Sequence, residues 1–169
     1  SHPQFICCSA TIANPKELAE TLTGEPMTLI DDNGAPMGER HVVLYNPPVV
    51  NQQLGIRRSC LLETRNIASM LVRNDIQSIV FARSRLHVEV LTKYLKDLVR
   101  SVLGEADRVR GYRGGYLPTQ RRDIERGLRD GRVTAVVATN ALELGIDIGR
   151  LDACVLCGYP GTIASTWQQ

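Results

Sequence analysis

The 169-residue sequence has few aromatic residues, few lysines and no long apolar run. Phenylalanine, tryptophan and tyrosine together make up 5% of the residues, so aliphatic side chains must fill the core of a globular domain. No apolar run approaches the roughly 18 residues that a membrane-spanning helix needs, and the N-terminus does not resemble a signal peptide. We therefore expect a domain with its own core and no membrane partner.

Several enzyme motifs are missing as well. The phosphate-binding pattern G-x-x-x-x-G-K-[ST] is absent, because none of the three lysines, Lys16, Lys93 and Lys96, follows a glycine. No Asp-Glu pair is present to hold Mg²⁺. The patterns G-x-G-x-x-G and G-x-S-x-G and a catalytic histidine cluster are missing too, which leaves a doubly wound enzyme for small molecules without support. We assign no catalytic residue and no metal site to this chain.

The five cysteines do not form a disulfide framework. Their number is odd and Cys7 and Cys8 are adjacent, which favours a reducing cytosol and hence a cytoplasmic protein. Cys154 and Cys157 form a C-x-x-C within a strand pattern, which places the two thiols on opposite faces. A zinc site needs a second pair of ligands, so we interpret both as core cysteines.

Positive charge is concentrated in the middle of the chain. The net charge is only +2, but residues 83–132 hold thirteen Lys and Arg against seven Asp and Glu. Most of these cations are arginines, whose planar guanidinium suits bidentate contact with phosphate. Solvated helix faces are the alternative explanation, and they account for several of these arginines.

Strand and helix patterns alternate over most of the chain. The expected strands cover residues 78–82, 108–111, 135–138 and 151–157, and the expected helices cover 54–73, 86–103 and 118–129. In the second helix we expect Val90, Leu91, Leu95, Leu98 and Val102 to face the core. This alternation predicts an α/β domain with a parallel sheet covered on both faces.

The first 51 residues read differently. Residues 4–8 form a strand pattern, Asn14 and Pro15 begin a helix, and Gly24 ends it. The following stretch contains the turn sequence Asp-Asp-Asn-Gly, and residues 27–30 and 40–45 on either side could form a hairpin-like pair. We interpret residues 25–51 as a connector.

The stretch TAVVATNALELGIDIGR, residues 134–150, combines a buried strand with polar residues at its exit. The strand pattern ends at Thr139, a helical turn follows, and the turn breaks at Gly145. Ligands gather where parallel strands end and helices begin. Five polar or glycine residues therefore share a candidate site edge: Thr139, Asn140, Glu143, Gly145 and Asp147. An ordinary strand–turn–helix junction has the same spacing and is the alternative.

This stretch resembles motif V of superfamily 2 helicases, T-x-x-x-E-x-G-[IL]-D. Four further segments resemble neighbouring motifs in the correct order: residues 8–11 motif III, residues 78–85 motif IV, residues 112–115 with 120–122 the region after it, and residues 165–169 the start of motif VI. Each segment alone is weak evidence, but their order over most of the chain is specific. The phrases SATIANP and YRGGYLP resemble the MrfA/YprA-like branch of the DEAD/DEAH-box DNA helicases.

The resemblance implies a fold and a domain order. The fold would be a three-layer α/β/α RecA-like domain with a mostly parallel sheet, preceded by a remnant of the first RecA-like lobe. Residues 1–24 would be that remnant, residues 25–51 the inter-lobe connector, and residues 52–169 the second RecA-like domain, truncated within motif VI.

The resemblance also implies a role for each matching residue. Ser84, Arg85, Arg113, Gly114, Thr139 and Asn140 would contact nucleic acid. Gly145, Asp147 and Gln168 would contact the nucleotide. Ser9, Ala10, Thr11 and Glu143 would couple the two lobes.

The expected function is that of the second motor lobe of an ATP-dependent helicase. The full-length enzyme would use ATP and Mg²⁺ and act on single-stranded or partly duplex nucleic acid, with DNA and DNA repair favoured by the branch. The missing first lobe would be its partner, so we expect neither bound nucleotide nor turnover in this chain alone. The alternative is a catalytically inactive RecA-like module that binds nucleic acid or serves as a scaffold. An intact phosphate loop in the upstream sequence would favour the motor.

Overall fold

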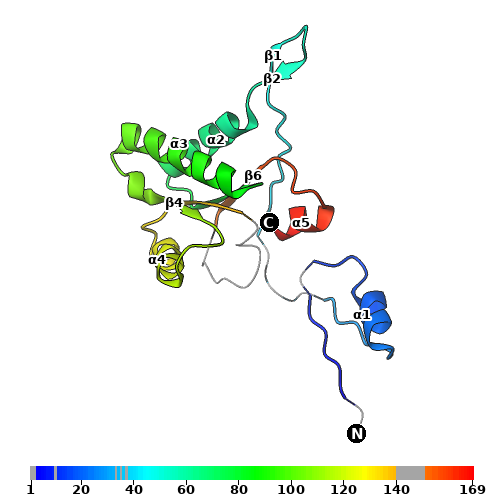
Figure 1. Cartoon of the computed structure of the whole chain (residues 1–169). Coiled ribbons are helices and arrows are strands. Elements are labelled where there is room, and N and C mark those ends of the chain that lie inside the picture. Colours follow the sequence, from blue (N-terminus) through cyan, green and yellow to red (C-terminus); the bar gives the residue numbers. More distant parts are fainter. Residues whose placement is uncertain (1–2, 10, 33, 35, 37, 140–150) are drawn as a thin grey trace. The chain divides into compact units, whose positions relative to one another are not determined.

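The computed structural model describes residues 3–9, 11–32, 34, 36, 38–139 and 151–169. The chain divides into two compact units, Ser1–Tyr45 with Gln168 and Asn46–Trp167 with Gln169. Figure 1 shows the elements of both units, coloured along the sequence. The division falls inside the stretch interpreted as a connector, and the domain limits at residues 24 and 51 stay predictions. No helix among the described residues is long and apolar enough to cross a membrane.

The first unit contains helix α1, Pro15–Thr23, which begins at the predicted proline and is followed by the predicted terminating Gly24. Gly24 adopts a left-handed φ of 73°, and its N–H donates to the carbonyl oxygen of Glu20. The predicted strand over residues 4–8 is wrong, because residues 3–9 are exposed and form no strand. Residues 27–30 and 40–45 form no hairpin either. A strand is stable only beside a partner strand, and the described residues of this unit contain none.

A short hairpin opens the second unit, and its second strand lies where a helix was predicted. Strands β1, Val49–Asn51, and β2, Ile56–Arg57, pair antiparallel. The N–H of Leu54 donates to the side-chain oxygen of Asn51, and Gly55 adopts a left-handed φ of 63°. These turn interactions exclude helix from residues 54–57, so the helix predicted over 54–73 begins six residues later.

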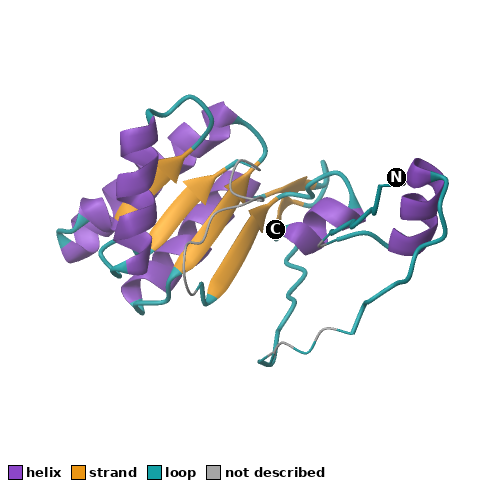
Figure 2. Cartoon of the chain, turned by 90° about the horizontal axis from the view of Figure 1, so that it is seen from below, coloured by secondary structure: helices purple, strands orange, loops and turns teal. Residues whose placement is uncertain are grey.

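A parallel sheet of four strands lies between helices on both faces, which confirms the predicted α/β class (Figure 2). Its strands stand in the order β4-β5-β3-β6. In chain order the elements are α2 Cys60–Arg73, β3 Ser78–Ala82, α3 Arg85–Leu103, the 3-10 turn η1 Ala106–Arg108, β4 Val109–Tyr112, α4 Pro118–Arg129, β5 Ala135–Ala138, β6 Ala153–Cys157 and α5 Ile163–Gln168.

The strands begin in register. Ser78 pairs with Ala135 on one side and with Ala153 on the other, and Val109 pairs with Ala135. Because all four strands are parallel and short, their carboxyl ends meet along one edge of the sheet. At the opposite edge, Gln77 connects neighbouring segments by hydrogen bonds. Its side-chain amide donates to the carbonyl oxygen of Val133, 3.2 Å away, and its backbone carbonyl accepts from the N–H groups of Asp152 and Ala153 at the start of β6.

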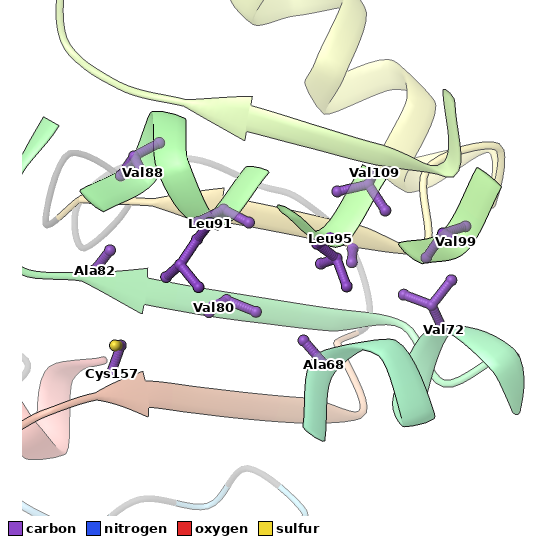
Figure 3. Packing of buried hydrophobic residues seen from close by; sticks show 12 residues of the cluster. Ala68, Val72, Val80, Ala82, Val88, Leu91, Leu95, Val99, Val109 and Cys157 are labelled. Carbon is purple, nitrogen blue, oxygen red and sulfur yellow. The ribbon is translucent and has the colours of Figure 1, made fainter. Parts of the chain in front are cut away.

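Two apolar clusters fill the space between the layers. On one face Val80 of β3 packs against Leu91 and Leu95 of α3 and against α2 (Figure 3). On the other face Ile79 and Phe81 of β3 pack against α4. Successive residues of β3 and β5 thus alternate between the clusters, as in a sheet buried on both sides.

Two predictions about buried residues are partly wrong. The buried stripe of α3 consists of Val88, Leu91, Thr92, Leu95 and Val99, so the predicted stripe is rotated, and Val102 is 46% exposed. Cys154 and Cys157 do lie on opposite faces of β6, but Cys157 alone is buried. β6 is the last strand in the sheet order, and α4 contacts β4 near the other end, so Cys154 stays exposed.

Candidate nucleic-acid interface

A cleft of about 550 Å³ lies at the edge where the strands end. Its lining comes from the exits of β3, β5 and β6, from the loop after β4 and from the C-terminal residues: Phe81, Ala82, Arg83, Ser84, Arg85, Gly114, Thr139, Cys157, Gly158, Pro160, Ser165 and Gln169. Ligands of open parallel sheets bind at this edge, because the polar loops there converge from several strands.

Ser84 and Arg85 form the junction between β3 and α3. Ser84 is the N-cap residue of α3, and its hydroxyl oxygen accepts from the backbone N–H of His87 at 3.2 Å. The Ser84 hydroxyl therefore keeps its own O–H as a donor. Arg85 is the exposed first residue of α3, and no ion pair joins it to any residue that the structure describes. The first turn of α3 contains no acidic residue.

Gly114 brings the loop after β4 to the same place. A Cβ atom at Gly114 would lie 3.7 Å from Nη2 of Arg85, so the guanidinium of Arg85 lies beside this loop. Thr139 follows the last residue of β5 and is half-buried in the cleft. Ser84, Arg85, Gly114 and Thr139, predicted from three separate segments of the sequence, thus lie in one cleft.

Arg113 does not line the cleft and forms an ion pair with Glu89 of α3. Its Nε donates to a carboxylate oxygen of Glu89 at 2.5 Å, and its guanidinium lies 4.9 Å from the centre of the Tyr116 ring. The Tyr116 hydroxyl donates to the same Glu89 oxygen at 3.3 Å. The hydrogen bond that Arg113 donates to Glu89 raises the pKa of Arg113, and burial followed by the charge of Glu89 raises the pKa of Tyr116. The charge of Arg113 is therefore largely matched by Glu89.

The exit of β6 contributes residues that the sequence reasoning missed. Gly158 has a φ of +89°, and a Cβ there would lie 3.3 Å from Cδ of Arg83, so the stem of Arg83 passes over this glycine. Pro160 follows in the same loop. The strand-exit rule applied to Thr139 could also have identified Gly158 and Pro160. Ser165 and Gln169 belong to residues 165–169, which resemble the start of motif VI, but a role was predicted only for Gln168 in that segment.

The remaining predicted residues lie elsewhere. Gln168 ends α5 and does not line the cleft, whereas its neighbour Gln169 does. Ser9 and Thr11 belong to the first unit. Five further predicted residues fall outside the described residues: Ala10, Asn140, Glu143, Gly145 and Asp147. Within the described ranges, no group of three or more His, Cys, Asp or Glu side chains could hold a metal ion.

Comparison with known proteins gives the family. The model of the family described as "Helicase conserved C-terminal domain" matches residues 61–169. The chain belongs to this family. Over 169 residues it is 59% identical to the uncharacterised ATP-dependent helicase YprA of Bacillus subtilis, a match that covers 100% of this chain and 22% of YprA. It is 40% identical over 170 residues to the ATP-dependent helicase HRQ1 of Saccharomyces cerevisiae, covering 98% of this chain and 16% of HRQ1.

A solved structure agrees with these relatives. The helicase C-terminal domain described here matches the DUF1998 helicase MrfA, bound to DNA and AMPPNP, with a TM-score of 0.90 and 58% identity. The match covers 99% of this chain and 23% of the MrfA chain. The predicted resemblance to the second RecA-like domain of the MrfA/YprA-like branch is confirmed. The chain spans about a fifth of the length of the curated relatives it matches, 22% of YprA and 16% of HRQ1.

Proposed function

We propose that this chain is the second motor lobe of an ATP-dependent DNA helicase and that its cleft holds the phosphate backbone of one strand. The observation that carries the proposal is the meeting of Ser84, Arg85, Gly114 and Thr139 at the strand exits of a helicase C-terminal domain. The preference for DNA over RNA rests on the relative MrfA, whose structure was solved with DNA.

Each cleft residue has a distinct part in phosphate contact. Arg85 supplies an exposed positive charge, and the hydroxyls of Ser84 and Thr139 supply donors. Gly114 has no side chain, so a phosphate can approach the backbone of its loop closely. These groups read no base edge, and the resulting contact is independent of sequence.

The nucleotide would lie against the segment that follows β5. We assign Gly145, Asp147 and Gln168 to one wall of the ATP site, and Ser9, Ala10, Thr11 and Glu143 to coupling between the lobes. ATP would enter with Mg²⁺, and the first lobe would supply the phosphate cradle that this sequence lacks. Two relatives named as ATP-dependent helicases and the AMPPNP in the MrfA structure support this assignment.

We infer the cellular setting from the composition and from the family resemblance. The cysteine content favours work in the cytoplasm, and the resemblance to the MrfA/YprA-like branch favours DNA repair. The scarcity of apolar runs argues against a membrane partner.

The test measures how tightly a fluorescently labelled oligo-dT strand binds to the chain, with fluorescence anisotropy at low salt as the readout. We expect weak binding that oligo-dA matches, and a clear loss in the variant carrying both Arg85→Ala and Thr139→Ala. The matched control is Arg129→Ala, which removes an exposed arginine from the last position of α4, at the opposite edge of the sheet.

Three results would contradict the proposal. They are no binding at low salt, an equal loss with Arg129→Ala, or ATP hydrolysis by the purified chain alone. The last result would mean that the phosphate cradle does not lie in another lobe.

A further inference from the structure

Two cysteines from distant parts of the chain meet at the border of the cleft. Cys60 is the first residue of α2, and Cys157 is the last residue of β6. Their sulfur atoms lie 3.7 Å apart although 97 residues separate them in sequence. Cys60 is exposed to solvent, whereas Cys157 is 7% exposed and lines the cleft. Figure 3 shows Cys157 at the end of β6 among the buried residues around Val80.

The short distance between the two sulfur atoms suits a disulfide better than a metal site. A disulfide has an S–S distance of about 2.05 Å, so the two sulfur atoms must approach by about 1.7 Å, which a rotation of the exposed Cys60 side chain can supply. A structural metal site needs more than two ligands, and among the described residues no third His, Cys, Asp or Glu joins this pair.

We propose that Cys60 and Cys157 form a reversible intramolecular disulfide when the chain meets a small disulfide oxidant. The inference does not depend on the proposed function. In a reducing cytosol such a bond would be transient, as cytosolic disulfides usually are.

The reaction is a double thiol–disulfide exchange. The thiolate of the accessible Cys60 attacks an oxidant R–S–S–R, which forms a mixed disulfide and releases one RS⁻. The thiolate of Cys157 then attacks the Cys60 sulfur, which closes the protein disulfide and releases the second RS⁻. The two protons lost by the protein thiols are taken up by the two RS⁻ groups, so two RSH form for each oxidant consumed.

The second step should depend on pH, because the attacking thiol is buried. Burial raises the pKa of the Cys157 thiol to about 11, despite a hydrogen bond from Thr64 and the positive charge of Arg83, which act in the other direction. The neighbouring Cys60 acts in the same direction as burial. Only the thiolate attacks, so closure should accelerate as the pH rises from neutral into the mildly alkaline range.

Closure would join the start of α2 to the end of β6. Gly158 follows Cys157 directly and lies against Arg83. The new bond would therefore fix the strand exit on which this side of the cleft is built.

The experiment uses the 169-residue chain with Cys7→Ser, Cys8→Ser and Cys154→Ser, which leaves this pair as its only cysteines. The chain is incubated with oxidised glutathione from neutral to mildly alkaline pH and analysed by intact mass and by peptide mapping. We expect a loss of two hydrogen masses, no free thiol after denaturation, a Cys60–Cys157 peptide, faster closure at higher pH and full reversal by dithiothreitol.

The control is the same chain with Cys60→Ser, an exposed change that leaves Cys157 alone and should keep it reduced. A second control avoids substitution altogether: the unmodified chain should give the same Cys60–Cys157 peptide. The proposal is overturned if glutathione stays on Cys60 without closure, if both thiols stay free, or if the unmodified chain pairs other cysteines.

Discussion

Arg85 and Arg113 should differ in how much they contribute to strand binding, although the sequence predicts the same role for both. Arg85 has no ion pair with any described residue, whereas Arg113 donates to Glu89 at 2.5 Å. A cation releases counterions from a strand only if its charge is available to a phosphate. We therefore expect Arg85→Ala to lower the salt dependence of oligo-dT binding by the amount that one phosphate contact contributes. Arg113→Ala should lower it by much less.

The size of the effect follows from counterion release. For a single strand, each phosphate contact adds about 0.7 to the slope of log K against log salt, so one contact costs about 2.6-fold in affinity between roughly 50 and 200 mM salt. In Arg85→Ala, the loss of affinity between roughly 50 and 200 mM salt should therefore be smaller by about 2.6-fold. In Glu89→Gln, the loss of affinity over the same salt range should be larger by up to that factor, because the substitution abolishes the negative charge that Arg113 faces. When Arg113→Ala is added to Glu89→Gln, this increase in the salt dependence should disappear.

The assay is a series of anisotropy titrations at four or more salt concentrations for these variants. Circular dichroism and thermal unfolding serve as controls, and neither should change much, because the side chains of Arg113 and Glu89 are 30% and 48% exposed. Equal slopes for Arg85→Ala and Arg113→Ala, together with no response to Glu89→Gln, would refute the reasoning. Arg113 would then reach the phosphate despite its carboxylate partner.

Three further predictions concern stability. Leu91→Ala removes a side chain that is 1% exposed and should cost about 2–5 kcal/mol of unfolding free energy in urea titrations, whereas Leu86→Ala, at 69% exposure on the same helix, should cost less than about 0.5 kcal/mol. Gly127→Ala places a Cβ 2.7 Å from Cγ2 of Val133 and should lower the melting temperature, although alanine favours helices elsewhere. Because the pKa of Cys157 is raised from 9.0 to about 11 in the folded chain, its contribution to stability is complete below pH 9 and is lost as the pH rises toward 11, and urea midpoints across that range should fall less in Cys157→Ala.

Local signals in the sequence were sufficient for the sheet and for some helix limits. The apolar run of β3 and the proline that begins α4 predicted both elements to the residue. For α3, local signals did not predict which face of the helix is buried. Its length and its Leu91–Leu95 pair were predicted, but apolar residues lie on several of its faces. The stripe that meets the sheet is chosen by packing, and Val99 is buried while Val102 is not.

The same limit applies to the site. Thr139 could be predicted because it directly follows β5, and Ser84 because it lies between β3 and α3, since parallel strands end at one edge. The pairing of Arg113 with Glu89 could not, since the partners lie 24 residues apart and meet only after α3 packs on the sheet. The proximity of Cys60 and Cys157 has the same origin. Contacts between distant residues depend on the assembled fold, which no window of the sequence contains.

The helices that follow β3 and β4 begin at the same edge of the sheet as the cleft. The peptide dipoles of α3 and α4 therefore add, at their first turns, to a partial positive potential directed toward that edge. Neither first turn contains an acidic residue that would cancel it. This potential belongs to the backbone and survives every side-chain substitution. A chain carrying both Arg85→Ala and Arg113→Ala should thus retain a small, salt-sensitive attraction for anions. Removing further arginines should lower the affinity only to the level that the helix dipoles provide, and not to zero.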